Sequence, residues 1–454
     1  MPQRTRRALG AALLLFPLAS GAEVVSRTLD NGLEVLVQPD HRAPVATTMV
    51  WYRVGGIDEP LGRTGISHVL EHLMFQGTEN LAPGEYAETV ARHGGDYNAF
   101  TAQDYTAYYA TLASDRLEVA LRLEADRMAH VQFKEESFAK EVKVVQEERR
   151  TRVENSPSAR AQEALRSVAY DGSAYAYPVV GWMEDLETLE LAEVQRWYER
   201  YYTPSNARLV IAGDVRPERA FRLAEEYFGD IPNQGEPAEV NPNPAVPARG
   251  QRSLTIRDRV RVPRLSMVYG APDRTTAEAD WELAALRLAA GILSGGRSAR
   301  LPAELVRGEG VATSAGASFS PYSRAPRLFK VAGRPADDTD LDALQSTLEA
   351  QIRRLREEPV AAEELERVKR QIRASVVFRR DSVAGLAREL GILETIGYGH
   401  EFRETYLEQI ESVTPEKIHQ VARKYLVPER RTVMHLEPEE DSTALEEGES
   451  GHAR

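Results

Sequence analysis

The chain has 454 residues, which is more than one compact core usually holds, so two to four domains are expected. Its formal net charge of −13 excludes a typical nucleic-acid binder, because such a protein needs a basic face. Hydrophobic residues make up 42% and charged residues 28% of the chain, which is ordinary for a soluble globular protein.

The N-terminal segment 1–22 has the three regions of a secretory signal peptide. Three arginines precede residue 8, residues 8–18 are apolar, and residues 20–22 are the small residues of a cleavage site. We therefore expect residues 1–22 to be removed and the protein to be periplasmic or secreted.

The chain contains no cysteine, so its stability must come from its core rather than from disulfides. No later apolar run is long enough to predict a membrane span.

The first half of the remaining chain mixes strand and helix patterns. Apolar alternations on both sides of Asn31-Gly32 predict a hairpin with a tight two-residue turn. In chain order, the pattern then predicts a strand at 45–56, helices at 65–77 and 84–93, strands within 96–112, a long helical region at 114–170, a buried strand at 206–215 and a helix at 217–231.

Residues 232–251 are rich in proline and predict an extended linker. After it the order starts again, with a strand at 263–272, a helix at 277–296, a strand at 325–335, two helical stretches and a last strand at 430–438. This repetition predicts an α+β fold of two duplicated domains of about 200 residues, each a sheet covered by helices. The expected divisions are the domains 23–231 and 252–437, the linker 232–251 between them, and an acidic, disordered tail at 438–454.

The stretch GISHVLEHLMFQGT holds the chemically most specific pattern of the chain, His68-x-x-Glu71-His72. On a helix, residues four apart leave the same face, so both imidazoles can reach one metal ion, and Glu71 lies beside them where it can hold a water. Apolar neighbours such as Val69 and Leu70 would make burial of these polar groups costly without a shared partner. The pattern therefore favours a zinc site over a solvated polar cluster.

A catalytic zinc ion needs a third protein ligand from another element and one open position. The segment KEVKVVQEERRTRVE offers Glu141, Glu147 and Glu148. Glu141 and Glu148 are seven apart and share one stripe of a helix, whereas Glu147 points about 100° away, toward solvent. Such a charge run, taken alone, is usually only the solvated face of a helix.

The two motifs together resemble the pitrilysin–insulinase family of zinc peptidases. The sequence HVLEH is followed, after 75 intervening residues, by a glutamate that has another one seven positions before it. The branch of short chains that includes the mitochondrial processing peptidase subunits is the most similar, in particular the zinc-bearing beta subunit. The resemblance runs from about residue 24 to 436 and includes GGDYNAFTAQDYTAYY, NARLVIAGDV and SGGRSARL.

The resemblance implies a role for each matching residue. His68, His72 and Glu148 would bind one Zn²⁺ per chain, Glu71 would be the general base, and Glu141 would orient the site. Asn98, Ala99 and Thr101 would lie on an edge strand that pairs with the backbone of a peptide substrate. The implied activity is endopeptidase cleavage of peptides or unfolded segments in a chamber that two such duplicated halves, or two subunits, close like a clamshell.

One part of the family pattern is missing. Family members that act alone carry an Arg and a Tyr seven apart in the C-terminal half, whereas the matching segment ELVRGEGVATSAG places Val306 and Thr313 there, with Arg307 one residue out of register. Either the alignment is displaced at this point, or the chain is the catalytic subunit of a heterodimer whose homologous partner supplies the Arg and the Tyr. Two other functions remain open, a non-catalytic core subunit of a complex and a zinc-binding protein.

Overall fold

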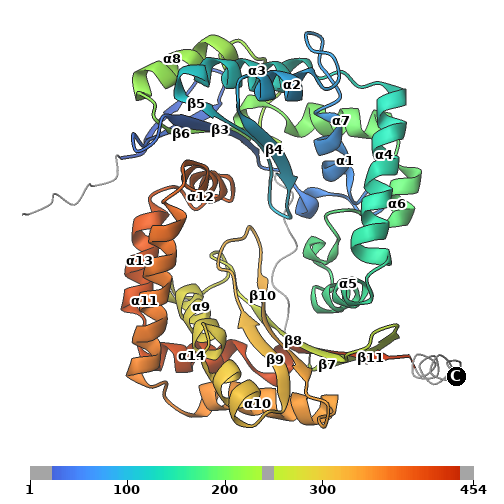
Figure 1. Cartoon of the computed structure of the whole chain (residues 1–454), viewed down its shortest axis with the longest axis vertical. Helices are drawn as coiled ribbons and strands as arrows, with labels where there is room; N and C mark the ends of the chain where they lie inside the picture. The colour runs from blue at the N-terminus through green and yellow to red at the C-terminus, as the bar shows by residue number, and fades with distance from the viewer. Residues whose placement is uncertain (1–22, 238–249, 440–454) are drawn as a thin grey trace, which may run out of the picture.

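The computed structural model describes residues 23–237 and 250–439. The predicted signal peptide therefore lies outside the described residues, as do residues 238–249 of the linker and 440–454 of the predicted tail. The described chain forms two α+β domains, which confirms the predicted fold class. Figure 1 shows the two sheets facing each other across the molecule, with most helices on the outside.

The first domain is built on a six-stranded sheet with the order β1-β2-β6-β3-β5-β4. Its strands are β1 (Val25–Thr28), β2 (Glu34–Pro39), β3 (Val45–Tyr52), β4 (Asp96–Thr101), β5 (Thr106–Ala113) and β6 (Ala207–Gly213). Strands β2 and β6 are parallel, and the other pairs are antiparallel. The predicted hairpin joins β1 to β2, but its loop runs from residue 29 to 33 instead of making a two-residue turn.

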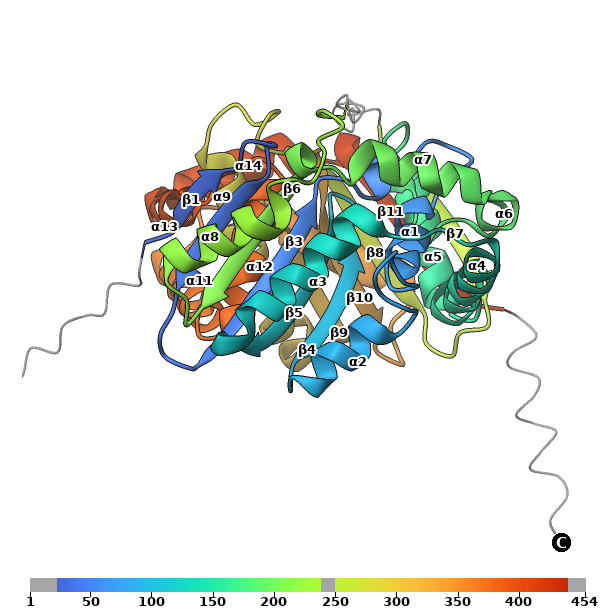
Figure 2. The ribbon, with the colours of Figure 1, turned by 90° about the horizontal axis from the view of Figure 1, so that it is seen from above.

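Helices α3 (Leu117–His130) and α8 (Pro217–Phe228) cover the outer face of this sheet, as Figure 2 shows from above. Strand β3 explains why the sheet is buried on both sides. Val50 and Tyr52 point into the core under these helices, whereas Met49 and Trp51 belong to a second cluster on the opposite face. Apolar residues on both faces are the mark of a central strand with a cover on each side.

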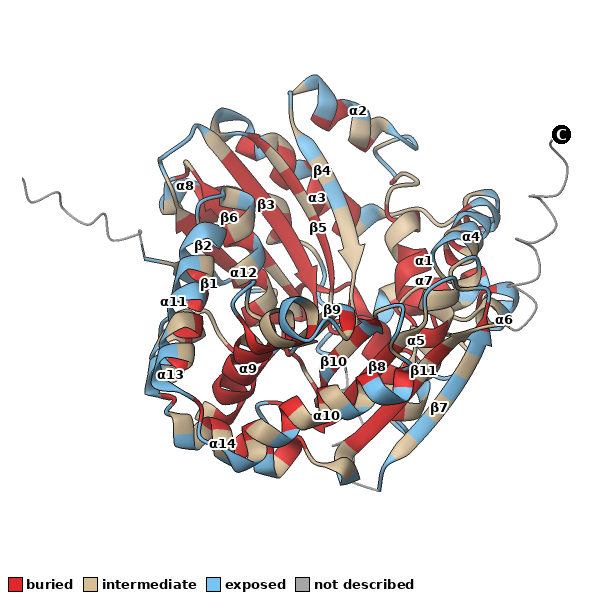
Figure 3. Cartoon of the chain, turned by 60° about the horizontal axis from the view of Figure 1, so that its bottom comes forward, coloured by how far each residue is buried: buried red, intermediate tan, exposed pale blue. Residues whose placement is uncertain are grey.

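The second domain has a five-stranded sheet with the order β7-β11-β8-β10-β9. Its strands are β7 (Arg252–Asp258), β8 (Arg264–Ala271), β9 (Ala312–Ser318), β10 (Arg327–Pro335) and β11 (Arg431–Pro438). Its main core packs around the apolar helix α9 (Trp281–Ser294), together with α10 (Leu341–Glu357), α11 (Ala362–Arg379), α13 (Phe402–Ser412) and α14 (Pro415–Tyr425). Figure 3 shows that the edge strands β4 and β7 are more exposed than the central strands β3 and β8.

Each domain contributes one helix to the inner face of the other domain's sheet. Helix α12 (Val383–Thr395) of the second domain packs on β3 and β6, where Leu386, Ala387 and Leu390 meet Trp51. Helix α5 (Pro157–Ala169) of the first domain packs on β11 and β7. The contact between the domains therefore includes two buried apolar clusters.

Several ion pairs also cross between the domains, and two of them involve the buried carboxylates of Asp58 and Asp104. Arg324, before β10, pairs with Asp58 through both nitrogens at 2.7 and 2.9 Å, and both side chains are almost fully buried. Arg327 pairs with Asp104 at 2.8 Å, and the hydroxyl of Tyr175 donates to the same carboxylate. Buried charges of this kind are tolerated only because each has its partner.

Several helices were predicted too coarsely from the sequence. The single region 114–170 is three helices, α3, α4 (Glu135–Arg149) and α5, with a π-helical stretch at Arg150–Glu154. The two stretches expected before the last strand are five helices, α10–α14, and strands β7 and β9 were not predicted. The remaining helices are α1 (Ile66–Leu73), α2 (Glu85–Arg92), α6 (Met183–Thr188) and α7 (Leu191–Tyr201). Within the described ranges, no helix has the length and apolar character of a membrane span.

Gly391 on α12 tests the domain contact, because a Cβ there would lie 2.0 Å from Cε2 and Nε1 of Trp51. We expect Gly391→Ala to lower the free energy of unfolding by about 1–3 kcal/mol through overpacking, although alanine is the better helix former. Urea unfolding measures this. Ala384→Val, at an exposed position of the same helix, is the matched control and should change stability by less than about 0.5 kcal/mol. Equal effects of the two variants would contradict the packing.

Candidate functional site

Helix α1 carries the HxxEH motif, and a buried carboxylate holds its first turn. The backbone N–H groups of Gly65 and Ser67 donate to the two oxygens of Glu59 at 2.7 and 2.9 Å. A negative charge suits the positive end of a helix, and these bonds satisfy two donors that a helix start leaves free. Burial nevertheless raises the pKa of Glu59 to about 7.

The start of α1 also passes very close to another part of the first domain. Gly65 has a φ of +87°, and a Cβ at this position would lie 2.8 Å from the Cα of Gly181 and from the carbonyl oxygen of Val180. Only glycine fits such a position without strain. The contact and the Glu59 carboxylate together fix where the helix begins, and hence where its histidines point.

The structure brings His68, His72 and Glu148 together. One ligand atom from each lies within 4.8 Å of the other two. Nε2 of His68 is 3.7 Å from Oε2 of Glu148, and Nε2 of His72 is 4.0 Å from Oε1. Ligand atoms around a tetrahedral zinc ion lie about 3.3 Å apart, since the bonds are about 2.0–2.1 Å. Each histidine would therefore have to approach Glu148 by less than about 1 Å to share one ion.

The protonation state of these groups also fits a metal. Burial lowers the pKa of His68 to about 3, with smaller contributions from His72 and Arg152, so its imidazole is neutral and can act as a ligand. Its Nδ1 is buried without a hydrogen-bond partner among the described residues. Two imidazole nitrogens and one carboxylate oxygen are a donor set of catalytic zinc sites, so the residues present fit this ion.

A second glutamate, Glu141, holds His72 in place. Nδ1 of His72 lies 3.1 Å from Oε2 of Glu141, whose other oxygen accepts from Nε2 of Gln76 at 3.0 Å. A bond from Nδ1–H to this carboxylate leaves Nε2 free to face Glu148. Glu141 is buried, whereas the neighbouring Glu147 is largely exposed and pairs with Arg150, as the helical stripe predicted.

Glu71 leaves α1 toward the sheet and meets the edge strand β4. Its Oε2 accepts from the Thr101 hydroxyl at 2.6 Å. Burial raises the pKa of Glu71, while the Thr101 hydrogen bond and the charge of His72 act in the opposite direction. Among the described strands, β4 pairs only with β5, so its other edge is open, and the N–H of Ala99 donates to Oδ1 of Asn98 at 2.8 Å.

The segment that matches the Arg and Tyr positions of the family spans two elements. Val306 lies on a helical turn, Leu301–Gly308, and packs against the second core, whereas Thr313 is exposed on β9. Tyr322 lies in the connection between β9 and β10, where its ring contacts Tyr398, Phe402 and Tyr406.

Models of two protein domains match the chain. "Insulinase (Peptidase family M16)" matches residues 34–181, and "Peptidase M16 inactive domain" matches residues 188–372. A relative named "Zinc protease PqqE", from Helicobacter pylori, is 30% identical over 91% of this chain and 92% of its own length. The chain belongs to the insulinase family, peptidase family M16.

Other proteins are similar to this chain in sequence or in fold. "Uncharacterized zinc protease YmxG" of Bacillus subtilis is 26% identical over 87% of this chain and 94% of its own. A crystal structure of a protease from Helicobacter pylori superimposes with a TM-score of 0.86, at 28% identity, and covers 92% of this chain and 99% of that one. The periplasmic protease PqqL from Escherichia coli shares the fold, with a TM-score of 0.77 at 19% identity, but this M16 chain matches only 48% of its length.

Sequence reasoning missed Glu59 and Gln76. A capping carboxylate is normally sought within a few residues of the helix start, and Glu59 precedes Gly65 by six, so only the folded loop reveals it. Gln76 follows the motif by four residues, which is one helical turn from His72. That spacing is the one signal that could have found it.

Glu59 gives the metal-free protein a characteristic pH dependence. Because its pKa is raised in the folded state, its contribution to stability is full below the unfolded pKa near 4.5 and is lost as the pH rises through 7. Relative to Glu59→Gln, the wild type should therefore lose roughly 2 kcal/mol of unfolding free energy between pH 5 and pH 8. Urea unfolding of both proteins in a chelator measures the difference. Glu218→Gln, at an exposed site, is the control, and a wild-type slope equal to that of Glu59→Gln would refute the effect.

Proposed function

We propose that the chain is a zinc-dependent endopeptidase that hydrolyses peptides or unfolded segments. One observation carries the proposal. His68, His72 and Glu148 converge within 4.8 Å, and Glu71 of the same helix reaches the open edge strand β4 through Thr101. The zinc-protease names of the relatives support the same activity.

In this proposal His68, His72 and Glu148 hold one Zn²⁺, and Glu141 keeps the ring of His72 oriented. When bound, the ion supplies Lewis acidity and lowers the pKa of a water molecule toward about 7. The remaining chemistry belongs to Glu71. Its carboxylate takes a proton from the attacking water and passes it to the leaving amine nitrogen. Burial raises its pKa and so makes it a better base for the first of these steps.

Strand β4 would hold the substrate as an added strand. Its outer edge offers backbone groups, and the N–H of Ala99 is occupied only by the side chain of Asn98, which a substrate carbonyl can replace. Thr101, at the end of the strand, joins this edge to Glu71. Recognition through the backbone tolerates varied side chains, which suits unfolded segments.

We further propose that this chain is the catalytic subunit of a heterodimer. Val306 and Thr313 cannot provide the basic and phenolic groups that family members acting alone use, and the E. coli protein with the same fold is about twice as long. A homologous partner would supply the Arg and Tyr and close the chamber. Removal of residues 1–22 would accompany export to the periplasm or beyond.

Glu71→Gln tests the catalytic role. Because the proposed partner completes the site, we expect the zinc-loaded chain from residue 23 onward to cleave a quenched mixed-peptide substrate only slowly when alone. The variant should lose this activity by 10²–10⁴-fold, roughly the size of general acid–base catalysis. Bound zinc, measured by metal analysis, should remain at one per chain. A wild type that binds zinc but cleaves nothing alone would favour the heterodimer. A wild type that binds no zinc would leave a non-catalytic subunit.

Glu141→Gln tests the proposed support of His72. Loss of the carboxylate should weaken zinc binding by about 10–100-fold, because the imidazole loses its fixed tautomer and orientation. Competition with a fluorescent chelator gives the dissociation constant. Glu147→Gln, on the exposed side of the same helix, makes the same change of charge and should leave it unaltered. If both variants weakened zinc binding equally, the loss would come from the change in net charge and not from the contact between Glu141 and His72.

A further inference from the structure

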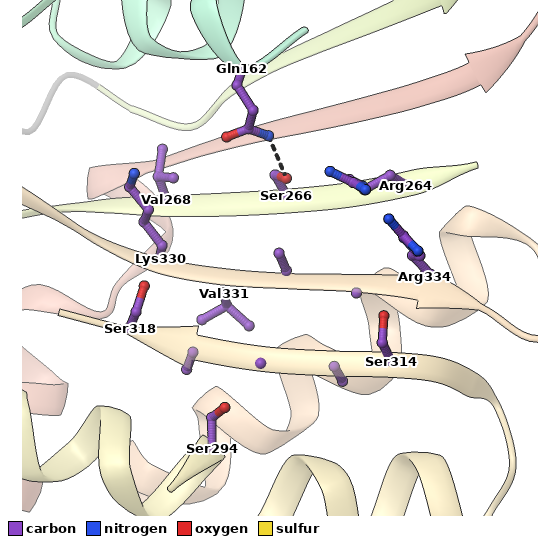
Figure 4. Close-up of a pocket in the computed structure, with 15 residues that line it drawn as sticks. Gln162, Arg264, Ser266, Val268, Ser294, Ser314, Ser318, Lys330, Val331 and Arg334 are labelled. Carbon is purple, nitrogen blue, oxygen red and sulfur yellow. Dashed lines mark hydrogen bonds between the residues drawn. The ribbon is translucent and has the colours of Figure 1, made fainter. Parts of the chain in front are cut away.

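A hollow on the inner side of the second domain is lined by basic side chains. It consists of two cavities of about 550 and 420 Å³ that share Ser318 and Lys330, and we call the two together the basic groove. The first cavity lies over β8, β9 and β10, with Gln162 of α5 above it, bonded to Ser266 (Figure 4). The second extends from there to the junction of the two domains.

The charged side chains that line this groove are all basic. Its basic residues are Arg166, Arg264, Arg287, Arg327, Lys330, Arg334 and Arg379, and no Asp or Glu is among the described residues that line it. In the described part of the chain, only Arg327 of these seven forms an ion pair, with Asp104. The whole chain has 70 acidic and 57 basic residues, so the groove is the opposite of the average surface.

The cations lie close enough to repel one another. The side chains of Arg264 and Arg334 meet at one end of the groove in Figure 4, and Lys330 lies at the other end, beside Ser318. Burial lowers the pKa of Arg264, and the charge of Arg334 lowers it further. The pKa of Lys330 is likewise lowered by burial and then by Arg166 and Arg327. Like charges held in a concave site with few counter-ions attract an anion.

The floor of the groove leaves room for such an anion. Strand β9 has the sequence ATSAGAS, so it carries only small side chains, and it is the free edge of its sheet among the described strands. The hydroxyls of Ser314 and Ser318 line the same space. A peptide segment can therefore approach the strand closely while its own long side chains reach the surrounding arginines.

The groove begins close to the proposed catalytic site. Gln103 lines its second cavity and follows Thr101, the hydrogen-bond partner of Glu71, by two residues. Thr101 ends β4 and Gln103 lies in the tight connection between β4 and β5, so their Cα atoms lie at most about 7 Å apart. A peptide held along β4 would thus need only a few more residues to enter the groove.

We propose that the basic groove binds carboxylate groups of the peptide substrate, so that this enzyme selects acidic segments. The inference rests on the proposed peptidase function and adds a substrate class to it. It runs against the overall charge of −13, which by itself would favour basic peptides. An observed preference for acidic peptides would therefore have to come from a local site.

Peptide binding to the zinc-loaded Glu71→Gln variant tests the groove without cleavage. The probes are fluorescein-labelled unstructured peptides with capped ends that carry four Glu, four Gln or four Lys, and a Gln peptide with a free C-terminal carboxylate. Anisotropy titrations at low salt give the dissociation constants. We expect the Glu peptide, or the free-carboxylate peptide if the terminus is the group bound, to bind about tenfold more tightly than the capped Gln peptide.

The pair Arg264→Gln and Arg334→Gln should remove this preference. Arg122→Gln with Arg219→Gln, on exposed positions of the outer helices α3 and α8, changes the net charge equally and should retain it. Equal binding of all peptides, tighter binding of the Lys peptide, or equal loss in the two variants would overturn the proposal. Hydrolysis by the wild type is measured separately. Cleavage without an acidic preference refutes only the groove, and a preference in a protein that neither binds zinc nor cleaves peptides refutes only the peptidase.

Discussion

Two ion pairs join the second domain to the two loops of the first domain that flank the candidate active site. Arg324 forms an ion pair with Asp58. The next residue, Glu59, caps the helix that carries His68 and His72. Arg327 forms an ion pair with Asp104. Asp104 follows Thr101, the last residue of the edge strand β4, by three residues. The second domain thus holds both loops that position the proposed ligands and the proposed base, although it contributes no residue to the three-ligand cluster. The second domain therefore supports the site through its contacts with these loops.

Much of this arrangement could be predicted from the sequence, because it depends on local spacing. The spacing of four from His68 to His72, and of seven from Glu141 to Glu148, are helical repeats, and the structure places each pair on a common face. The fold class followed from the repeated order of strands and helices on either side of the linker. The family resemblance then supplied the connection between these two helices, which are distant in the sequence.

The parts that could not be predicted depend on contacts distant in sequence. Glu59 acts through a loop, and the exchange of α5 and α12 between the sheets leaves no local signal. Strand β9 consists of small residues and lacks the alternation of apolar and polar side chains that predicts a strand. The sequence therefore predicted neither this strand nor the groove above it. The cations of that groove come from both domains, from Arg166 on α5 to Arg379 at the end of α11, and only the folded chain gathers them.

The exchanged helix α12 has a consequence for how the protein is made. The first sheet is complete at Gly213, but the helix that covers its inner face begins only at Val383. A chain that emerges from its N-terminus therefore exposes an apolar surface around Trp51 until most of the second domain has followed. Such surfaces attract chaperones and promote aggregation. We therefore expect the two domains to fold together, and a fragment cut at the linker to expose the apolar surface around Trp51.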